Sequence, residues 1–211
     1  MPKLVPFLAG AIVATATLSG VARGPTARAD YPKPSLAPTS WQLDFQHGTP
    51  TRIVVDVPGS PAPMAYWYMT YTVTNNTDQE QPFLPKFEML TEDGKVVRSD
   101  DHIPAAVFER IKAQEKKSLL EPAYKIGGTL RIGEDQQRDG VAIWPDPPGR
   151  MGNFSIFVEG LSGEIATVKA GDKEFILRKQ LKLNWHIRGD EVRKGEDEVN
   201  TDSPPEEWVM R

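Results

Sequence analysis

The segment Tyr66-Trp-Tyr-Met-Thr-Tyr-Thr-Val-Thr-Asn-Asn76 carries the strongest structural signal in the chain. Apolar side chains occupy every second position: Trp67, Met69, Tyr71 and Val73. Because successive side chains of a β-strand point to opposite faces, this period of two predicts a strand with one face in a hydrophobic core. The asparagines that follow are typical of a turn and end the strand.

Similar short apolar runs predict further strands on both sides of this segment. In chain order they lie at residues 41–45, 52–57, 86–91, 95–97, 129–132, 140–144, 153–158 and 173–187. The Asp93-Gly94 pair between two of them is a strong hairpin signal, because glycine tolerates the positive φ of a tight turn. Pro82 and Pro85 indicate that strand pairing starts only at Lys86.

The same pattern predicts the core and the fold class. Apolar residues of three long strands share one phase, and we expect them to meet in a single core: Trp67, Met69, Tyr71, Val73, Phe154, Ile156, Val158, Leu181 and Leu183. Lys179 interrupts the apolar phase of the last strand. Seven to nine short strands with regular turn signals predict a mainly β domain, built as a sandwich of two sheets.

One segment, residues 104–120, departs from the β pattern. Val107, Phe108 and Ile111 recur at helical spacing among good helix-forming residues. Pro104 suits the first turn of a helix, and Pro122 lies just beyond its end. The segment predicts one amphipathic helix inserted in the β domain, docked through its apolar stripe.

The N-terminal residues 1–29 resemble a secretory signal peptide. Lys3 precedes an apolar stretch, and Ala27-Arg28-Ala29 is a small-x-small cleavage signal, which predicts cleavage before Asp30. The protein is therefore expected to be secreted or periplasmic, with no membrane span after signal removal. The formal net charge of the whole chain is −4, and removal of the three basic residues in this segment brings it to −7. This charge argues against a nucleic-acid partner.

Two regions flank the predicted domain at residues 41–188. Residues 30–40 form a proline-rich lead-in, and residues 189–211 form an acidic tail that is expected to be mostly mobile. The tail ends with Trp208, Val209 and Met210, whose apolar side chains are costly to leave in water. They either fold back onto the protein, near Tyr66 and Tyr68, or anchor the tail in a partner's groove.

Four segments together resemble immunoglobulin-like domains of bacterial exported proteins. They are Tyr71-Thr-Val-Thr-Asn-Asn-Thr, Phe87-Glu-Met-Leu-Thr-Glu-Asp-Gly-Lys, the strand at 141–144 and residues 154–161. The resemblance implies an immunoglobulin-like two-sheet sandwich over residues 41–188. It also implies a binding or spacer role, as such domains have.

Few residues suggest catalysis. The best local cluster is Asp100-Asp101-His102, which suits either a cation site or a solvated loop that caps the predicted helix. We favour the loop and predict no catalytic, metal-binding or cofactor-binding residue. A hydrolase or metal-dependent enzyme that uses these three residues is the alternative, and it requires them to converge in a pocket.

Aromatic residues provide the candidate partner-binding site. Tyr66 and Tyr68 lie on the face opposite Trp67, where they either stack on a sugar or protein partner or are covered by the inserted helix. With Trp208, Val209 and Met210 they are the predicted partner-binding residues. The predicted function is that of a non-enzymatic binding or spacer module of the cell envelope, with a protein or polysaccharide as partner.

Overall fold

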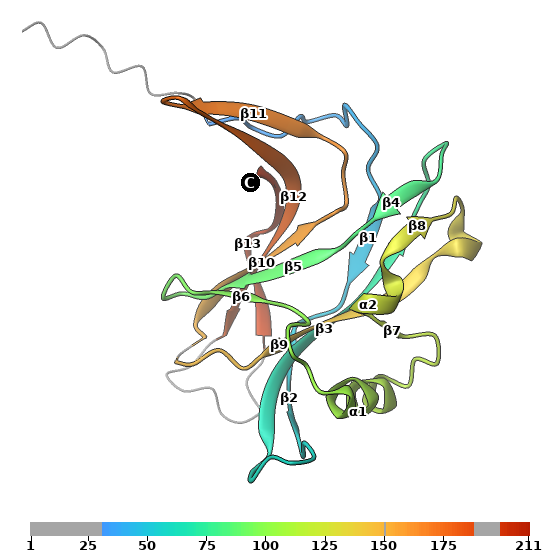
Figure 1. The fold of residues 1–211 in the computed structure, drawn as a ribbon, viewed down its shortest axis with the longest axis vertical. Coiled ribbons are helices and arrows are strands. Elements are labelled where there is room, and N and C mark those ends of the chain that lie inside the picture. The colour runs from blue at the N-terminus through green and yellow to red at the C-terminus, as the bar shows by residue number, and fades with distance from the viewer. Residues whose placement is uncertain (1–30, 150, 188–198) are drawn as a thin grey trace, which may run out of the picture. The chain divides into compact units, whose positions relative to one another are not determined.

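The computed structural model describes residues 31–149, 151–187 and 199–211. The fold is mainly β, as predicted, with several sheets and two α-helices (Figure 1). The strands are β1 (Asp44–His47), β2 (Thr51–Val55), β3 (Met64–Thr74), β4 (Gln81–Phe83), β5 (Lys86–Leu90), β6 (Val96–Arg98), β7 (Glu121–Pro122), β8 (Gly128–Leu130), β9 (Arg138–Pro145), β10 (Asn153–Glu159), β11 (Ile165–Ala170), β12 (Lys173–Ile187) and β13 (Val199–Met210). The helices are α1 (Ala105–Glu115), α2 (Ala123–Ile126) and the short 3-10 helix η1 (Glu134–Gln136).

The strands form three sheets. The five-stranded sheet has the order β1-β3-β9-β7, and β2 also pairs with β3. The six-stranded sheet has the order β11-β12-β10-β5-β6, with β13 on β12, while β4 and β8 form a two-stranded sheet. Strand β3 is central to its sheet, because β1 and β2 pair with its two halves along one edge and β9 pairs along the other.

The main core lies between the two large sheets. All nine residues predicted to share one core belong to a single buried cluster, which confirms that prediction. Tyr71 lies at its centre: its ring centroid is 4.9 Å from that of Phe87 and 5.4 Å from that of Phe45. Gly140 is opposite Tyr71 on β9, and a Cβ there would lie 2.4 Å from the Tyr71 ring.

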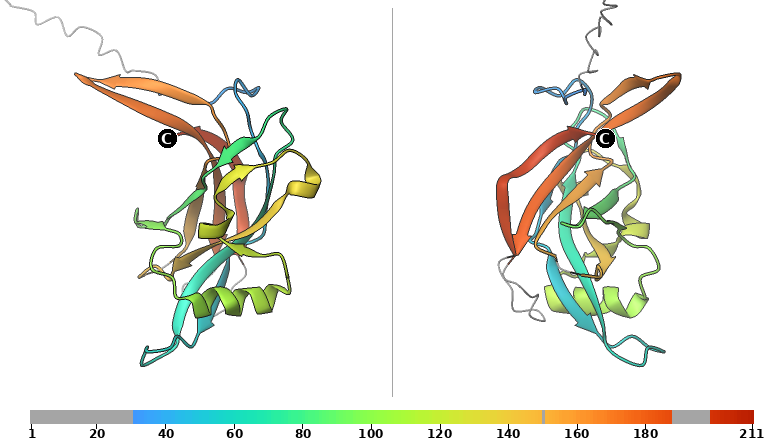
Figure 2. Two further views of the ribbon diagram at one scale, coloured as in Figure 1. Left: turned by 45° about the vertical axis from the view of Figure 1, so that its right-hand side comes forward. Right: turned by 90° about the vertical axis from the view of Figure 1, so that its left-hand side faces the viewer.

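A second buried cluster lies on the other face of β3. Tyr66 and Tyr68 are only 3 % and 2 % exposed there, and they pack with Val141 of β9 and with residues of α1. The Tyr68 hydroxyl donates to Glu115 Oε1 at 2.7 Å, at the end of the helix. Helix α1 lies beside β2 (Figure 2). Tyr66 and Tyr68 are therefore not an exposed partner-binding surface, because the helix covers them.

Helix α1 is shorter than predicted, but it docks as expected. Val107 and Ile111 are fully buried and Phe108 packs beside them. The helix ends where Lys116 adopts a left-handed conformation with φ of 54°. Among the described residues, neither helix has the length and apolar character needed to cross a bilayer.

Two of the strands that were not predicted, β4 and β11, lie where apolar alternation is weak. Strand β4 contains Pro82 and pairs only with β8, so that a proline is tolerated at this sheet edge. Strand β11 pairs with the first part of β12 in a hairpin that extends from the end of the six-stranded sheet (Figures 1 and 2). Its residues are mostly exposed, because the hairpin continues past the core, and Phe175 and Ile176 of β12 are exposed as well.

The acidic tail, predicted to be mostly mobile, instead contains β13. This strand runs antiparallel to β12, and the register shifts between Leu183 and Trp185. The shift leaves residues 202–205 without ladder partners, and Pro204 and Pro205 lie there, where no proline has to donate a hydrogen bond. The strand forms because Trp208 and Met210 bury apolar surface while Glu207 pairs with Lys182 on the other face. The first part of the predicted tail, residues 189–198, lies outside the described residues.

A candidate ligand groove between the lead-in and β13

A groove of about 530 Å³ lies between the lead-in and the end of β13. Its walls are residues 31–36 on one side and residues 207–210 on the other. Trp208, Val209 and Met210, predicted to bind a partner, thus lie together at this groove. They reach it because the tail folds back beside β12, although far from Tyr66 and Tyr68, which belong to the second core cluster.

The strand that forms one wall has a free edge. Arg178 and Arg211 exchange both backbone hydrogen bonds, at 2.8 and 2.9 Å. In an antiparallel ladder such pairs alternate with residues whose N–H and C=O point away from the partner strand. Met210 is in this position, and its carbonyl accepts a hydrogen bond of 2.7 Å from the Tyr31 hydroxyl of the lead-in. By the same alternation, the backbone of Trp208 points toward the groove, and no described strand pairs with this edge of β13.

A buried ion pair fixes the lead-in beside this strand. Lys179 is 2 % exposed, and its Nζ lies 3.1 Å from Oε2 of Glu164, which is 9 % exposed. The Ser35 amide donates to Oε1 of the same carboxylate at 2.8 Å, and Lys179 Nζ donates to the Ser35 carbonyl at 3.4 Å. The ammonium also lies 5.0 Å from the ring centroid of Trp208. One lysine therefore connects the lead-in, the six-stranded sheet and the groove.

The electrostatics of this pair favour its charged form. Burial alone would raise the pKa of Glu164, but the Ser35 hydrogen bonds and the nearby Lys179 ammonium outweigh burial and hold the pKa below its usual value. The carboxylate is therefore ionised at neutral pH, opposite a buried ammonium. Removing only one partner of such a buried ion pair strongly destabilises the folded protein, because the remaining charge is left without a counter-charge.

The surface of the groove is largely apolar and aromatic. Trp208 is partly buried against the main core, while Tyr31 is 60 % exposed and Leu36 is fully exposed. Pro32 and Pro34 lie between Tyr31 and Leu36 along the opposite wall. Apolar walls next to outward-pointing backbone groups suit an extended ligand that offers both side chains and hydrogen-bonding groups.

The Asp100-Asp101-His102 cluster is not brought together in a pocket. Asp100 turns inward, where burial raises its pKa to about 6 and its amide donates to the Ile143 carbonyl at 2.7 Å. The side chains of Asp101 and His102 are 69 % and 96 % exposed. Within the described residues, no three His, Asp or Glu side chains are grouped to hold a metal ion. The convergence that the enzymatic alternative requires is not seen at this cluster.

Sequence reasoning did not identify several residues that form the groove. The lead-in was predicted only as a proline-rich segment that flanks the domain, so that Tyr31, Ser35 and Leu36 were not expected to form a wall. Glu164 lies in the short connection between β10 and β11, which has no motif of its own. Lys179 could have been identified from the sequence, because it stands in the apolar phase of a long strand. A lysine at such a position needs either a buried partner or a break in the core.

Comparisons with known proteins give little similarity. No family model matches the chain, and no curated protein matches it either. Among solved structures, the yjhA protein from Bacillus subtilis is similar at 14 % identity and a TM-score of 0.37; the match covers 65 % of this chain and 91 % of that one.

Proposed function

We propose that this protein is an exported, non-enzymatic binding module of the cell envelope that holds an extended segment of a partner protein in the groove. The observation that carries the proposal is the unpaired edge of β13 beside an apolar groove. An extended peptide added to this edge gains main-chain hydrogen bonds, and alternate side chains fill the space between Trp208 and the lead-in. A spacer role would need no such groove.

A protein segment fits this groove better than a polysaccharide does. Tyr31 and Trp208 could each stack on a sugar ring, but the second wall offers backbone groups at the spacing of a β-strand. These groups match another backbone and carry no preference for sugar hydroxyls. The polysaccharide partner is therefore the second choice, and binding to insoluble polysaccharides that depends on Trp208 would favour it.

We also propose that the two large sheets form an immunoglobulin-like sandwich. Two observations support this proposal. Residues 71–77 and 87–95 resemble segments of immunoglobulin-like domains, and the two sheets share one core. Modules of this kind present binding sites on edge strands and connecting loops, although the fold alone does not define a function. An experimental structure with a strand order unlike that of immunoglobulin-like domains would rule out this classification.

Export gives the first testable prediction. In the native host, we expect the full-length chain to be cleaved after Ala29, so that the mature protein starts at Asp30 and is found in the periplasm or medium. The measurement is the intact mass and N-terminal sequence of protein purified from each cell fraction. Ala27→Lys, which disrupts the small-x-small signal, should leave an uncleaved precursor. Mature-length protein from this variant, or uncleaved wild-type protein in the cytoplasm, contradicts export.

The groove gives the second prediction. Purified wild-type protein should select, from a phage-displayed library of random peptides, sequences whose apolar residues alternate. Leu36→Asp places a charge on the apolar wall at a fully exposed position, so that the fold is unaffected. We expect it to weaken the binding of a selected peptide at least tenfold, or about 1.4 kcal/mol, measured by fluorescence anisotropy.

The matched control is Leu119→Asp. Leu119 is 76 % exposed and does not line this groove, so the same change should leave peptide affinity unaltered. If Leu36→Asp and Leu119→Asp bind the selected peptides equally well, the groove is not the binding site. Selection of peptides without apolar residues would also contradict the proposal, because such peptides gain nothing from the walls.

A further inference from the structure

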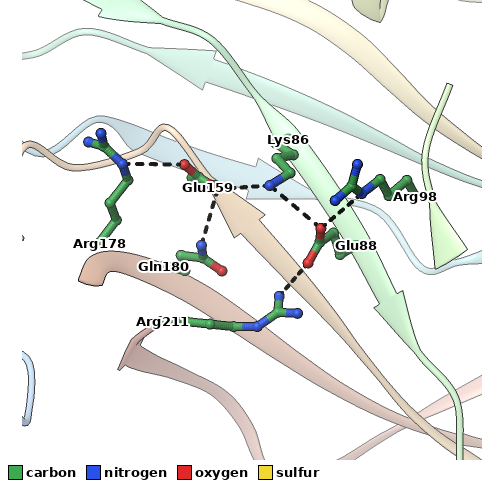
Figure 3. A network of polar contacts seen from close by, with 7 residues as sticks. All are labelled: Lys86, Glu88, Arg98, Glu159, Arg178, Gln180 and Arg211. Atoms are coloured by element: carbon green, nitrogen blue, oxygen red, sulfur yellow. Dashed lines mark hydrogen bonds and ion pairs between the residues drawn. The ribbon is translucent and has the colours of Figure 1, made fainter. Parts of the chain in front are cut away.

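The outer face of the six-stranded sheet carries a network of charged residues, away from both core clusters (Figure 3). At its centre lies Glu88 of β5, whose side chain is 12 % exposed. Arg211 approaches it most closely, with Nη1 2.7 Å from Oε2. Arg98 Nε and Lys86 Nζ lie 3.4 and 3.6 Å from Oε1.

A second acid, Glu159 of β10, extends the network. Lys86 Nζ lies 3.6 Å from its Oε2, and Arg178 Nε lies 3.7 Å from its Oε1. Gln180 donates to the same carboxylate at 3.2 Å. The network therefore holds four cationic side chains, from Lys86, Arg98, Arg178 and Arg211, against two carboxylates (Figure 3).

The face thus has a surplus of two positive charges in a chain whose formal net charge is −4. Neighbouring charges do not cancel it: Lys182 and Glu207 form their own pair at 2.7 Å, and Lys169 lies opposite Glu174 in the β11–β12 ladder. The cations hold the pKa of Glu88 below its usual value even though burial opposes this. Glu88 is consequently ionised at neutral pH, and two carboxylates cannot neutralise four cationic side chains.

Two of the arginines are exposed and have N–H donors that could bind a ligand. Arg98 and Arg178 are 69 % and 59 % exposed, and each contacts its glutamate through Nε. Neither forms another ion pair within the described part of the chain. A guanidinium has five N–H donors, so the terminal nitrogens of both side chains can bind a carboxylate in a bidentate manner.

The aromatic residue on this face is already covered. The guanidinium of Arg211 lies 4.3 Å from the ring centroid of Phe157, which is 8 % exposed. A sugar ring would need a free aromatic face for stacking. The surface instead presents separate cationic groups along the strands, which match carboxylates spaced along a polypeptide.

We propose that this cationic face, formed by Lys86, Arg98, Arg178 and Arg211, binds an acidic segment of a partner polypeptide. It is distinct from the groove, because none of these four residues lines the groove. Charge complementarity selects the partner: an acidic chain neutralises the surplus, while a basic chain adds to it.

The test is the binding of fluorescein-labelled oligoglutamate to the full chain, followed by fluorescence anisotropy at low and physiological salt. We expect wild-type protein to bind oligoglutamate, to bind more weakly as salt screens the charges, and not to bind oligolysine. Arg98→Glu combined with Arg178→Glu should weaken binding at least tenfold. The double variant Arg98→Gln with Arg178→Gln removes the two charges without adding repulsion, so it should weaken oligoglutamate binding by a smaller factor. The thermal unfolding midpoint of this variant shows whether the fold is intact.

The matched control reverses two exposed cations beside the opposite sheet, Arg110→Glu and Lys117→Glu, on and just after α1. It changes the net charge by the same amount and should leave oligoglutamate affinity within twofold of wild type. Equal weakening by the two charge reversals would show that net charge alone acts, and would overturn the proposal. Binding to polygalacturonate in preference to oligoglutamate would also overturn it, in favour of an acidic polysaccharide. Leu36→Asp in the groove should have no effect here, so that the two sites are tested separately.

Discussion

Tyr71→Ala is expected to lower the free energy of unfolding by about 4 kcal/mol, the usual range for removing a buried aromatic side chain. Tyr71 is 2 % exposed and its ring contacts those of Phe45, Phe83 and Phe87, which come from three different strands. Truncation leaves a cavity between the two large sheets that these rings cannot refill. Urea unfolding monitored by circular dichroism measures the change. A loss below about 0.5 kcal/mol would place Tyr71 outside the core.

Tyr71→Phe is the control for this variant. The Tyr71 hydroxyl is buried without a hydrogen-bond partner among the described residues. Removing an unsatisfied buried hydroxyl ends its desolvation cost, so Tyr71→Phe should keep full stability or gain up to about 1 kcal/mol. A loss larger than about 1 kcal/mol would mean that the hydroxyl is bonded in solution, and that its polar contact rather than its packing matters at this position.

The core could be predicted because apolar residues occupy every second position along most of its strands. In β3 and β10 this apolar phase is unbroken, and in β12 Leu181, Leu183 and Trp185 continue it beyond Lys179. The second cluster could not be predicted with the same certainty, since tyrosine is suited to both water and a core. Tyr68 is buried because its hydroxyl forms hydrogen bonds with Gln114 and Glu115 of α1. These residues lie 46 and 47 positions further along the chain.

Strand β13 was missed for a different reason. Its sequence is rich in acids and contains two consecutive prolines, which normally argue against a strand. The prolines fall in the register shift, and Glu207 finds Lys182 across the ladder. Both compensations depend on the partner strand, so no local pattern shows them. The sequence did contain the apolar character of Trp208 and Met210. Fold-back was one of the two alternatives drawn from it, although the contact is with β12 and not near Tyr66 and Tyr68.

Lys179→Met is expected to lower the free energy of unfolding by about 3 kcal/mol at pH 7, because it leaves the buried Glu164 carboxylate without its counter-charge. Methionine keeps most of the apolar stem, so packing is little changed. The loss should be local as well as global: Ser35 is held by the same pair, and hydrogen exchange of its amide should become faster in the variant. Chemical unfolding and hydrogen–deuterium exchange of residues 31–40 provide the two measurements.

The double variant Lys179→Met with Glu164→Gln separates charge from packing. Glutamine retains an oxygen at the place where Glu164 Oε1 accepts the Ser35 amide, but it carries no charge to be buried. We therefore expect the double variant to recover at least half of the stability that Lys179→Met loses, and to restore slow exchange at Ser35. If the double variant is no more stable than Lys179→Met, the lysine acts through packing, and an ion pair is not what holds the lead-in beside β13.

The pH dependence gives an independent signature of the same pair. In the wild-type protein the pKa of Glu164 is below its unfolded value, so its contribution is full above that value and is lost as the pH falls. In Lys179→Met the ammonium is lost while burial and the Ser35 hydrogen bonds remain, so the pKa of Glu164 is higher in the variant than in the wild-type protein. The difference in free energy of unfolding between the wild-type protein and Lys179→Met should therefore be largest at neutral pH. It should shrink toward pH 4, where Glu164 takes up a proton. A deficit that stays constant between pH 7 and pH 4 would show that Glu164 is not charged in the folded protein, and the groove would then need another explanation for its fixed wall.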